Sequence, residues 1–260
     1  MATLISSETN AEAWLRVMEH LLTCEGGKDF NLIVSIHDPC REIPAATRIV
    51  DDLAAGLDLK SSMENANSIW PSFFARPGRQ ATEVFGDIDR FVIGTIKKAC
   101  GNRHDSYIER LVAWRSFEQG EPVPQLQNIL SRLKTEVHNH APKSSSYEMS
   151  VFSPGLDPGY MSFPCLSHLS VKYDHRRRVV HLTALYRNHT FLSHAYGNYL
   201  GLGRLMAFIC AETGTKPGDL VSVSTHADAE LSHGRTRAIA AVDDMRAVLS
   251  EASAPDARRS

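Results

Sequence analysis

The chain has 260 residues, of which 43% are hydrophobic and 22% charged, and its formal net charge is −2. This length and apolar content suffice for one large domain with a buried core. The near-neutral charge argues against a nucleic-acid partner, which usually calls for a basic face. No apolar run is long enough to cross a bilayer, and the N-terminus lacks the basic start and apolar block of a signal peptide, so we expect no membrane association.

The first 120 residues predict mostly helices with one strand. Residues 9–23 have apolar side chains at helical spacing after a Thr9 or Asn10 cap. The run FNLIVSIHDP predicts a strand, and AATRIVDDLAAGL predicts a helix that ends near Gly56. Because ENANSIWPSFFARPG is rich in Asn, Ser and Pro, we expect it to be irregular. Two further helices are expected, over about 85–100 and about 105–118.

The second half predicts a helix and then several strands. PQLQNILSRLKTEVHN has an apolar stripe at helical spacing, and SSSYEMSVFSP alternates as a strand does. LSHLSVKYD and VVHLTALYRN, joined by HRRR, predict a β-hairpin. A helix over 197–214, a strand DLVSVSTHA and a last helix over about 234–251 follow. Strands grouped in this way, with helices around them, indicate an α+β fold with a mixed sheet in a single domain.

Cys165 is the candidate nucleophile of the sequence. The five cysteines are odd in number and form no CxxC pair, which indicates a reduced, cytoplasmic protein without a disulfide frame. Cys165 stands between Pro164 and the first strand of the hairpin. Free cysteines are usually buried and inert, and reactivity requires a cation that lowers the thiol pKa. Arg187, His168 and His226 are the candidates for that cation.

Two polar segments follow the predicted strands. YRNHTFLSHAYGN, from Tyr186 to Asn198, lies at a strand end, where ligand sites are common. Asn198 is equally interpreted as a ligand contact or as the cap of the next helix. THADAELSH offers His226, Asp228 and further polar side chains, but its spacing fixes no third ligand, so we expect no metal.

In this order the elements resemble those of the thymidylate synthase family. PQLQNILSRLKTEV is similar to the helix before that family's dimer-interface strands, and YEMSVFSPGLDPGYMSFPCLSH resembles the strand and loop that lead to its Pro-Cys nucleophile. The spacing from Arg187 to Asn198 equals that between the family's phosphate-binding arginine and its base-reading asparagine. KPGDLVSVSTHADAE is similar to its Pro-Gly-Asp-Phe strand, which ends in Thr-His-x-Tyr. The resemblance covers roughly residues 120 to 235.

The resemblance implies three parts of one domain and a reaction. Residues 1–120 would be a divergent N-terminal part, residues 121–251 the thymidylate synthase-like core, and residues 252–260 a flexible tail. A thiolate of Cys165, activated by Arg187, would add to C6 of a pyrimidine nucleotide or nucleoside, and C5 would then take a one-carbon unit from 5,10-methylenetetrahydrofolate. Asn198 would read the base, and His226 would contact the ribose. A homodimer formed through the sheet face is also implied.

Several residues differ from those that the family uses to bind its substrate, so the sequence leaves the base and the phosphorylation state of the substrate open. The paired phosphate-binding arginines align with Ser145 and Ser146, and the glutamine after the nucleophile falls near Ser170. The tyrosine of His-x-Tyr is Asp228. The glutamate that manages protons near C5 has only Asp52 and Glu64 as candidate counterparts.

Several alternatives therefore stay open. Within the transferase hypothesis, the product carries either a methyl group or a hydroxymethyl group at C5. The eroded phosphate site also allows a binding protein that has kept the fold and lost the chemistry. A third hypothesis is a hydrolase using Cys165 with His168 or His226, although no oxyanion-hole glycine pattern flanks the cysteine.

Overall fold

The computed structural model describes residues 1–75, 81–88, 90, 106–139, 144–159 and 164–253. Within them, one sheet has the strand order β1-β2-β7-β5-β4-β3, with the short β6 paired to β7. The strands are β1 (Thr3–Ser7), β2 (Lys28–Ile36), β3 (Glu148–Ser150), β4 (Leu166–Asp174), β5 (Val179–Tyr186), β6 (His189–Thr190) and β7 (Lys216–Asp228). The sheet is mixed, because β7 runs antiparallel to β2 and parallel to β5.

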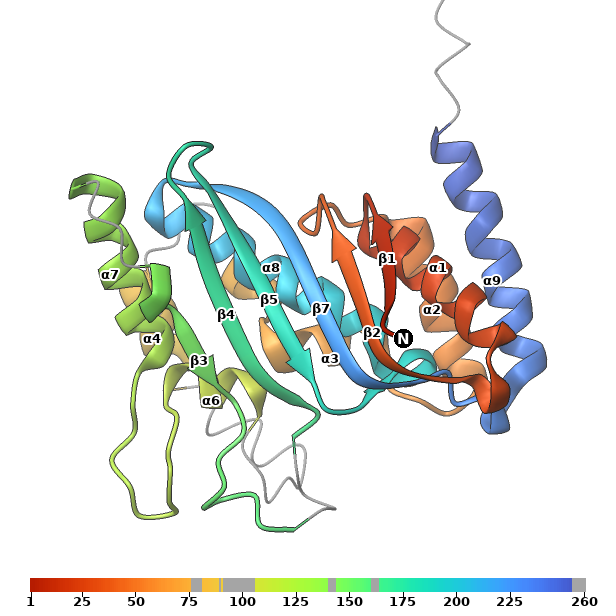
Figure 1. Ribbon diagram of the computed structural model, residues 1–260, viewed down its shortest axis with the longest axis horizontal. Helices are drawn as coiled ribbons and strands as arrows, with labels where there is room; N and C mark the ends of the chain where they lie inside the picture. Colours follow the sequence, from red (N-terminus) through yellow and green to blue (C-terminus); the bar gives the residue numbers. More distant parts are fainter. Residues whose placement is uncertain (76–80, 89, 91–105, 140–143, 160–163, 254–260) are drawn as a thin grey trace, which may run out of the picture.

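The helices lie behind the sheet in the view of Figure 1, where α8 crosses behind β5 and β7. Their bounds are α1 (Asn10–Thr23), α2 (Pro44–Gly56), α3 (Ser62–Ile69), α4 (Ala81–Asp87), α6 (Tyr107–Val112), α7 (Gln125–Asn139), α8 (Tyr196–Thr213) and α9 (Leu231–Ser253). The face of the sheet turned toward the viewer carries no helix in the described part of the chain (Figure 1). The described residues thus form two layers, a mixed sheet and the helices on one of its faces, as expected for an α+β fold.

Helix α8 is the centre of the core. Its side chains are buried nearly all round, and α3 packs along it. A Cβ on Gly197 or Gly201 would come within 2.5 or 2.7 Å of the backbone oxygens of Ser62 or Ala66 in α3. The two glycines therefore let the backbones of α3 and α8 approach closely, which gives the glycine-rich segment a packing role.

Most predicted elements are confirmed. Thr9 caps α1 by accepting a hydrogen bond from the Glu12 amide, α2 ends at Gly56, and β4 and β5 form the antiparallel hairpin. Helices α7, α8 and α9 and strand β7 also lie where they were expected. At the N-terminus, β1 was not predicted, and it pairs in parallel with β2.

The irregular structure expected for residues 64–78 is wrong for residues 64–69, and residues 76–78 lie outside the described residues. Residues 62–69 form α3, which Ser61 and Glu64 start with a reciprocal capping box. In the described chain, 3₁₀ turns at Glu25–Gly27, Ser72–Ala75 and Ser144–Ser146 border the regular elements. Of the helices expected at 85–100 and 105–118, the structure has α4 and α6, and residues 91–105 lie outside the described residues, as do 254–260 of the expected tail.

Among the described helices, none combines the length and apolar character that a membrane span requires.

Candidate active site

Cys165 is held where β4 begins beside the end of β5. Its carbonyl oxygen accepts a hydrogen bond from the Arg187 amide at 3.0 Å. The Arg187 Nε donates to the carbonyl of Pro164 at 3.1 Å. The residues after β5 and the residues before β4 are thereby tied together, and the half-buried Cys165 side chain lies beside the Arg187 guanidinium.

Asn188 links Cys165 to His226. The Asn188 side chain hydrogen-bonds the Cys165 thiol, and its Oδ1 lies 2.6 Å from Nδ1 of His226. An amide oxygen only accepts, so His226 donates this bond, and the amide NH₂ is turned toward the sulfur. His226 is itself packed against Phe30, with ring centroids 5.4 Å apart. Residues from β2, β4, β7 and the end of β5 therefore meet in one group.

Two opposing effects act on the Cys165 thiol. Burial raises its pKa, while the charge of Arg187 and the hydrogen bond from Asn188 lower it, and burial is the larger effect. The pKa therefore lies above its ordinary value, and the thiol keeps its proton at neutral pH. Arg187 and Asn188 are nonetheless the groups that would stabilise a thiolate formed there.

Two tyrosines flank the thiol, and the sequence analysis missed both. Burial, followed by the charge of Cys165, raises the pKa of Tyr107 to about 12, and its hydroxyl accepts a bond from the Leu166 amide at 3.5 Å. The Tyr186 hydroxyl is buried and has no hydrogen-bond partner among the residues that the structure describes. Such an unsatisfied hydroxyl is costly, and a polar ligand atom would relieve that cost. Tyr107 lies in the N-terminal part, where the resemblance gave no guidance.

Asn198 faces a buried histidine. Its Nδ2 lies 3.2 Å from Nε2 of His189, and Nδ1 of His189 lies 3.0 Å from the Ser224 hydroxyl. The His189 ring stacks on Tyr186 with centroids 4.0 Å apart. Asn198 lies inside α8, whose N-cap is Ala195, so the cap interpretation of Asn198 is wrong. The Asn198 amide therefore orients His189 from within the helix.

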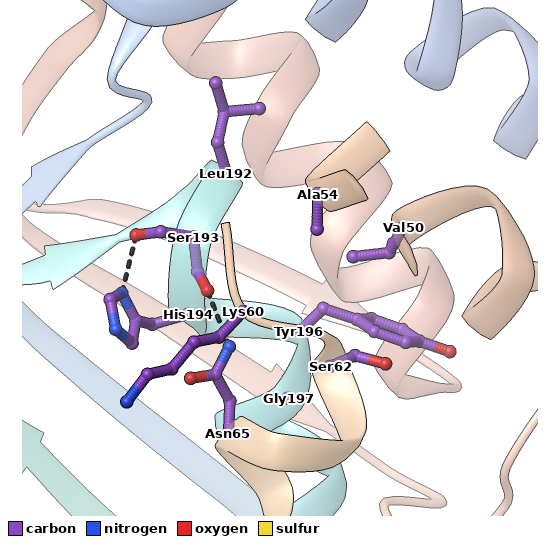
Figure 2. A pocket seen from close by; sticks show the side chains of 10 residues that line it. All are labelled: Val50, Ala54, Lys60, Ser62, Asn65, Leu192, Ser193, His194, Tyr196 and Gly197. Carbon is purple, nitrogen blue, oxygen red and sulfur yellow. Dashed lines mark hydrogen bonds between the residues drawn. The ribbon is translucent and has the colours of Figure 1, made fainter. Parts of the chain in front are cut away.

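A small hollow lies farther along the same segment, between α2, α3 and the start of α8 (Figure 2). The π-helical turn Phe191–Ala195 lines it with Leu192, Ser193 and His194, opposite Lys60 and Asn65. Asn65 donates to the Ser193 carbonyl at 2.6 Å, and the Ser193 hydroxyl lies 2.5 Å from His194 Nδ1. Glu230 accepts from the same hydroxyl at 2.7 Å. The hollow thus combines a cation, an imidazole and amide groups.

Four of the predicted site residues are engaged elsewhere. Ser170 points to the open sheet face, where it donates to Glu148 at 3.0 Å. Asp228 accepts from the Glu230 amide and pairs with Lys28 at 3.3 Å. Ser145 and Ser146 lie exposed in the 3₁₀ turn Ser144–Ser146. Their predicted contacts with substrate stay predictions.

The two candidate carboxylates also lie on the helical layer. Glu64 is exposed and accepts bonds from the amide and hydroxyl of Ser61, at 2.9 and 3.0 Å. These bonds hold its pKa below the ordinary value. Asp52 lines a groove between α2 and α9. His168, a candidate partner of Cys165, lies instead 2.8 Å from Glu148 on the open sheet face.

A buried ion pair fixes the segment that leads to Cys165. Arg110, in the same helix as Tyr107, donates to both carboxylate oxygens of Asp157, at 2.6 and 2.8 Å, and to the Val151 carbonyl. Their side chains are 5% and 0% exposed. Asp157 also accepts from the Ser153 amide. Helix α6 therefore positions Tyr107 beside the thiol and, through Arg110, the segment from Val151 to Asp157 that precedes Cys165.

The comparisons with known proteins give a distant relationship. No family model matches the chain. Over 122 residues the chain is 30% identical to a protein of Methanosarcina mazei named "Putative thymidylate synthase". The aligned residues cover 47% of this chain and 51% of that protein. Proteins of the same name from Methanosarcina acetivorans and Methanosarcina barkeri are 28% and 27% identical over the same shares. The chain thus spans about half the length of the curated relatives it matches, which suggests a thymidylate synthase-like relationship.

His189 predicts a loss of stability in acid. Burial lowers its pKa from 6.5 to about 3, so the folded protein binds this proton less readily than the unfolded chain. The stabilising contribution is complete above pH 6.5 and is lost as the pH falls toward 3, at up to about 1.4 kcal/mol per pH unit. Urea unfolding between pH 7 and 4 should show a weaker pH dependence in His189→Gln, and an unchanged slope would contradict the buried neutral imidazole.

Breaking the Arg110–Asp157 pair predicts a large destabilisation. Arg110→Met leaves the Asp157 carboxylate buried without its cation, which should lower the free energy of unfolding by about 3–5 kcal/mol. Lys134→Met is the matched control, because Lys134 pairs with Glu212 at 2.7 Å but is 47% exposed. Equal urea midpoints for the two variants would show that the buried pair stabilises the protein no more than the exposed pair does.

Proposed function

We propose that the chain is a thymidylate synthase-like transferase that moves a one-carbon unit to C5 of a pyrimidine nucleotide or nucleoside. The observation that carries the proposal is the group formed by Cys165, Arg187, Asn188 and His226. The distant similarity to proteins named thymidylate synthases supports it. The thymidylate synthase-like fold, expected from the resemblance, belongs to the same proposal.

In this mechanism Asn188 and Arg187 favour the thiolate form of Cys165. His226 fixes the amide by donating to its oxygen, so that an amide N–H points at the sulfur. His226 is then a positioning residue. The sulfur electron pair adds to C6 of the pyrimidine, the C5–C6 double bond opens, and C5 becomes the carbon nucleophile. After C5 has gained its substituent and lost its proton to solvent, the electron pair left on C5 restores the C5–C6 double bond and the C–S bond breaks, which returns the thiolate.

Methylenetetrahydrofolate would supply the one-carbon unit when bound. The hollow of Figure 2 offers chemistry that suits a folate, with Lys60 for a carboxylate and Val50, Leu192 and Tyr196 for apolar rings. The hollow has essentially no enclosed free volume, whereas sites for ligands of that size have roughly 300–1,000 Å³. The hollow in this conformation therefore does not fit a folate, and the proposed steps of this chain's own residues do not depend on it.

The proposal includes both a methyl and a hydroxymethyl product, because residues of the candidate site differ from those of the family. A methyl product needs a hydride from the folate, whereas a hydroxymethyl product needs only water to capture the exocyclic methylene. By the resemblance, Ser145 and Ser146 stand where the family has arginines that bind its substrate. Mass spectrometry of the product separates the two.

A second candidate function is pyrimidine binding without turnover. The raised pKa of the Cys165 thiol favours it, because a protonated thiol does not add to C6. In the described structure Glu64 and Asp52, the candidate proton-managing carboxylates, lie in a capping box and in a groove at α9. This candidate predicts ligand-dependent stabilisation with no chemistry at C5.

The transferase proposal predicts Cys165-dependent release of tritium from C5. The purified chain is incubated with 5-tritiated uracil and cytosine nucleotides and nucleosides, with and without methylenetetrahydrofolate. We expect release to be lost in Cys165→Ala and lowered about 100-fold in Asn188→Ala, because removing one donor to a developing anion typically costs that much.

Cys40→Ala is the control, since that thiol bonds the Gly203 carbonyl and burial raises its pKa to about 12. No release from any substrate, together with a nucleotide-dependent rise in melting temperature, would favour the binding protein. Neither release nor a rise in melting temperature would refute both.

We also propose a homodimer through the open face of the sheet. One row of paired positions across four strands is apolar on this face: Leu4 pairs with Ile33, Ile33 with Val223, and Val223 with Leu185. Leu4 is 72% and Leu185 38% exposed. A continuous exposed apolar row is typical of a contact surface, and a second copy of the sheet is the occupant that the resemblance implies.

The dimer proposal predicts that Leu185→Asp yields monomers in sedimentation velocity. Leu185 ends the apolar row on β5, and a charge placed there would be buried and unpaired in the dimer and would weaken it. Ile239→Asp is the control, because Ile239 is 42% exposed on α9, away from the sheet face. A monomeric parent protein, or equal dissociation of both variants, would count against this interface.

A further inference from the structure

Three side chains of metal-binding kinds converge between α1 and β2, outside the group around Cys165. His20 Nε2 lies 2.7 Å from Asp29 Oδ2 and 3.5 Å from Cys24 Sγ. All three potential ligand atoms lie within 4.8 Å of one another. The three residues are half-buried, so a metal ion can reach them. The donor set is one imidazole nitrogen, one sulfur and one carboxylate oxygen.

The local chain builds this cluster within ten residues. Cys24 follows His20 by four residues, so both lie on one face at the end of α1. Gly26 and Gly27 then adopt φ values of +62° and +71°, in the left-handed region that other residues rarely occupy. This turn reverses the chain, and β2 brings Asp29 back beside the end of α1.

We propose that His20, Cys24 and Asp29 form a zinc site with water as the fourth ligand. Zinc takes sulfur, imidazole and carboxylate ligands at about 2.0–2.3 Å in a tetrahedron, which puts nitrogen about 3.6 Å from sulfur and about 3.4 Å from oxygen. The distance from His20 to Cys24 already matches. The distance from His20 to Asp29 is that of a hydrogen bond, and it would open by about 0.7 Å around the ion.

The surroundings of the cluster suit a bound cation. Thr3 Oγ1 donates to Asp29 Oδ2 at 2.8 Å, and the Phe30 amide donates to Oδ1 at 2.7 Å, so the carboxylate is oriented from behind. Two anionic ligands balance the charge of Zn²⁺. Binding displaces the Cys24 thiol proton to solvent, and His20 gives the metal an Nε2 that carries no proton.

The zinc ion would fasten the end of α1 to the start of β2. That start is also where Lys28 pairs with Asp228 and where the Phe30 ring packs on His226. The site would therefore stabilise the strand that supports His226. The inference does not rest on the proposed transferase activity.

A cobalt titration tests the site. The metal-stripped, reduced full-length chain is titrated with Co²⁺, and we expect one equivalent to give the near-ultraviolet band of a thiolate–cobalt bond. Zn²⁺ should abolish that band by displacement and should raise the melting temperature. Cys24→Ser should lose the band. No band in the parent protein, or a band that persists in Cys24→Ser, would overturn the proposal.

His37→Gln is the matched control, because Nδ1 of His37 lies 2.9 Å from Asp219 at the other end of β2 with no cysteine in that group. It should bind cobalt as the parent does, and equal loss in both variants would show adventitious histidine binding. Thr3→Val keeps all three ligands, so it serves if Cys24→Ser fails to fold. It should weaken zinc binding tenfold or more, and an unchanged zinc affinity would count against the site.

Discussion

The pairing of β7 on both of its edges is the constraint on which the rest of the structure depends. Its antiparallel ladder with β2 and its parallel ladder with β5 join the N-terminal strands to the β4–β5 hairpin. Registers fix His226 opposite Phe30 and place the end of β5 beside Ser224. Because the end of β5 then lies beside the start of β4, Asn188 reaches Cys165 on one side and His226 on the other.

The thiol illustrates a conflict between burial and charge. A low-dielectric surrounding raises the pKa of Cys165, while the same surrounding strengthens its interaction with Arg187. A bound anionic or polar ligand would alter both effects at once, so the resting state of the thiol does not define its reactivity. The aromatic and imidazole side chains near the thiol remain uncharged at neutral pH, because burial shifts the pKa values of Tyr107, Tyr186 and His189 away from neutrality.

The two faces of the sheet differ in what they contact. On one face, α8 and its neighbours bury the core, and the close approach of α3 at Gly197 and Gly201 leaves only a narrow hollow beside His194. On the other face, polar side chains around Glu148 border an apolar row from Leu4 to Leu185. The candidate site consists of residues in or next to strand ends, so the strand pairing that places those ends side by side sets its geometry.

The sequence by itself determined the elements that depend on neighbouring residues. Period-2 alternation predicted β4, β5 and β7, helical spacing predicted α1, α7 and α8, and the order of Cys165, Arg187, Asn198 and His226 predicted one group of candidates. The helix α3 was missed because composition was weighed above the Ser61–Glu64 capping box, a signal that is present in the sequence. Only the tertiary structure decided that Asn188 is the residue between Cys165 and His226, that Tyr107 arrives from a distant helix, and that Asn198 bonds His189. These contacts join residues 9 to 59 positions apart, and sequence spacing does not fix them because strand pairing and helix packing bring those residues together.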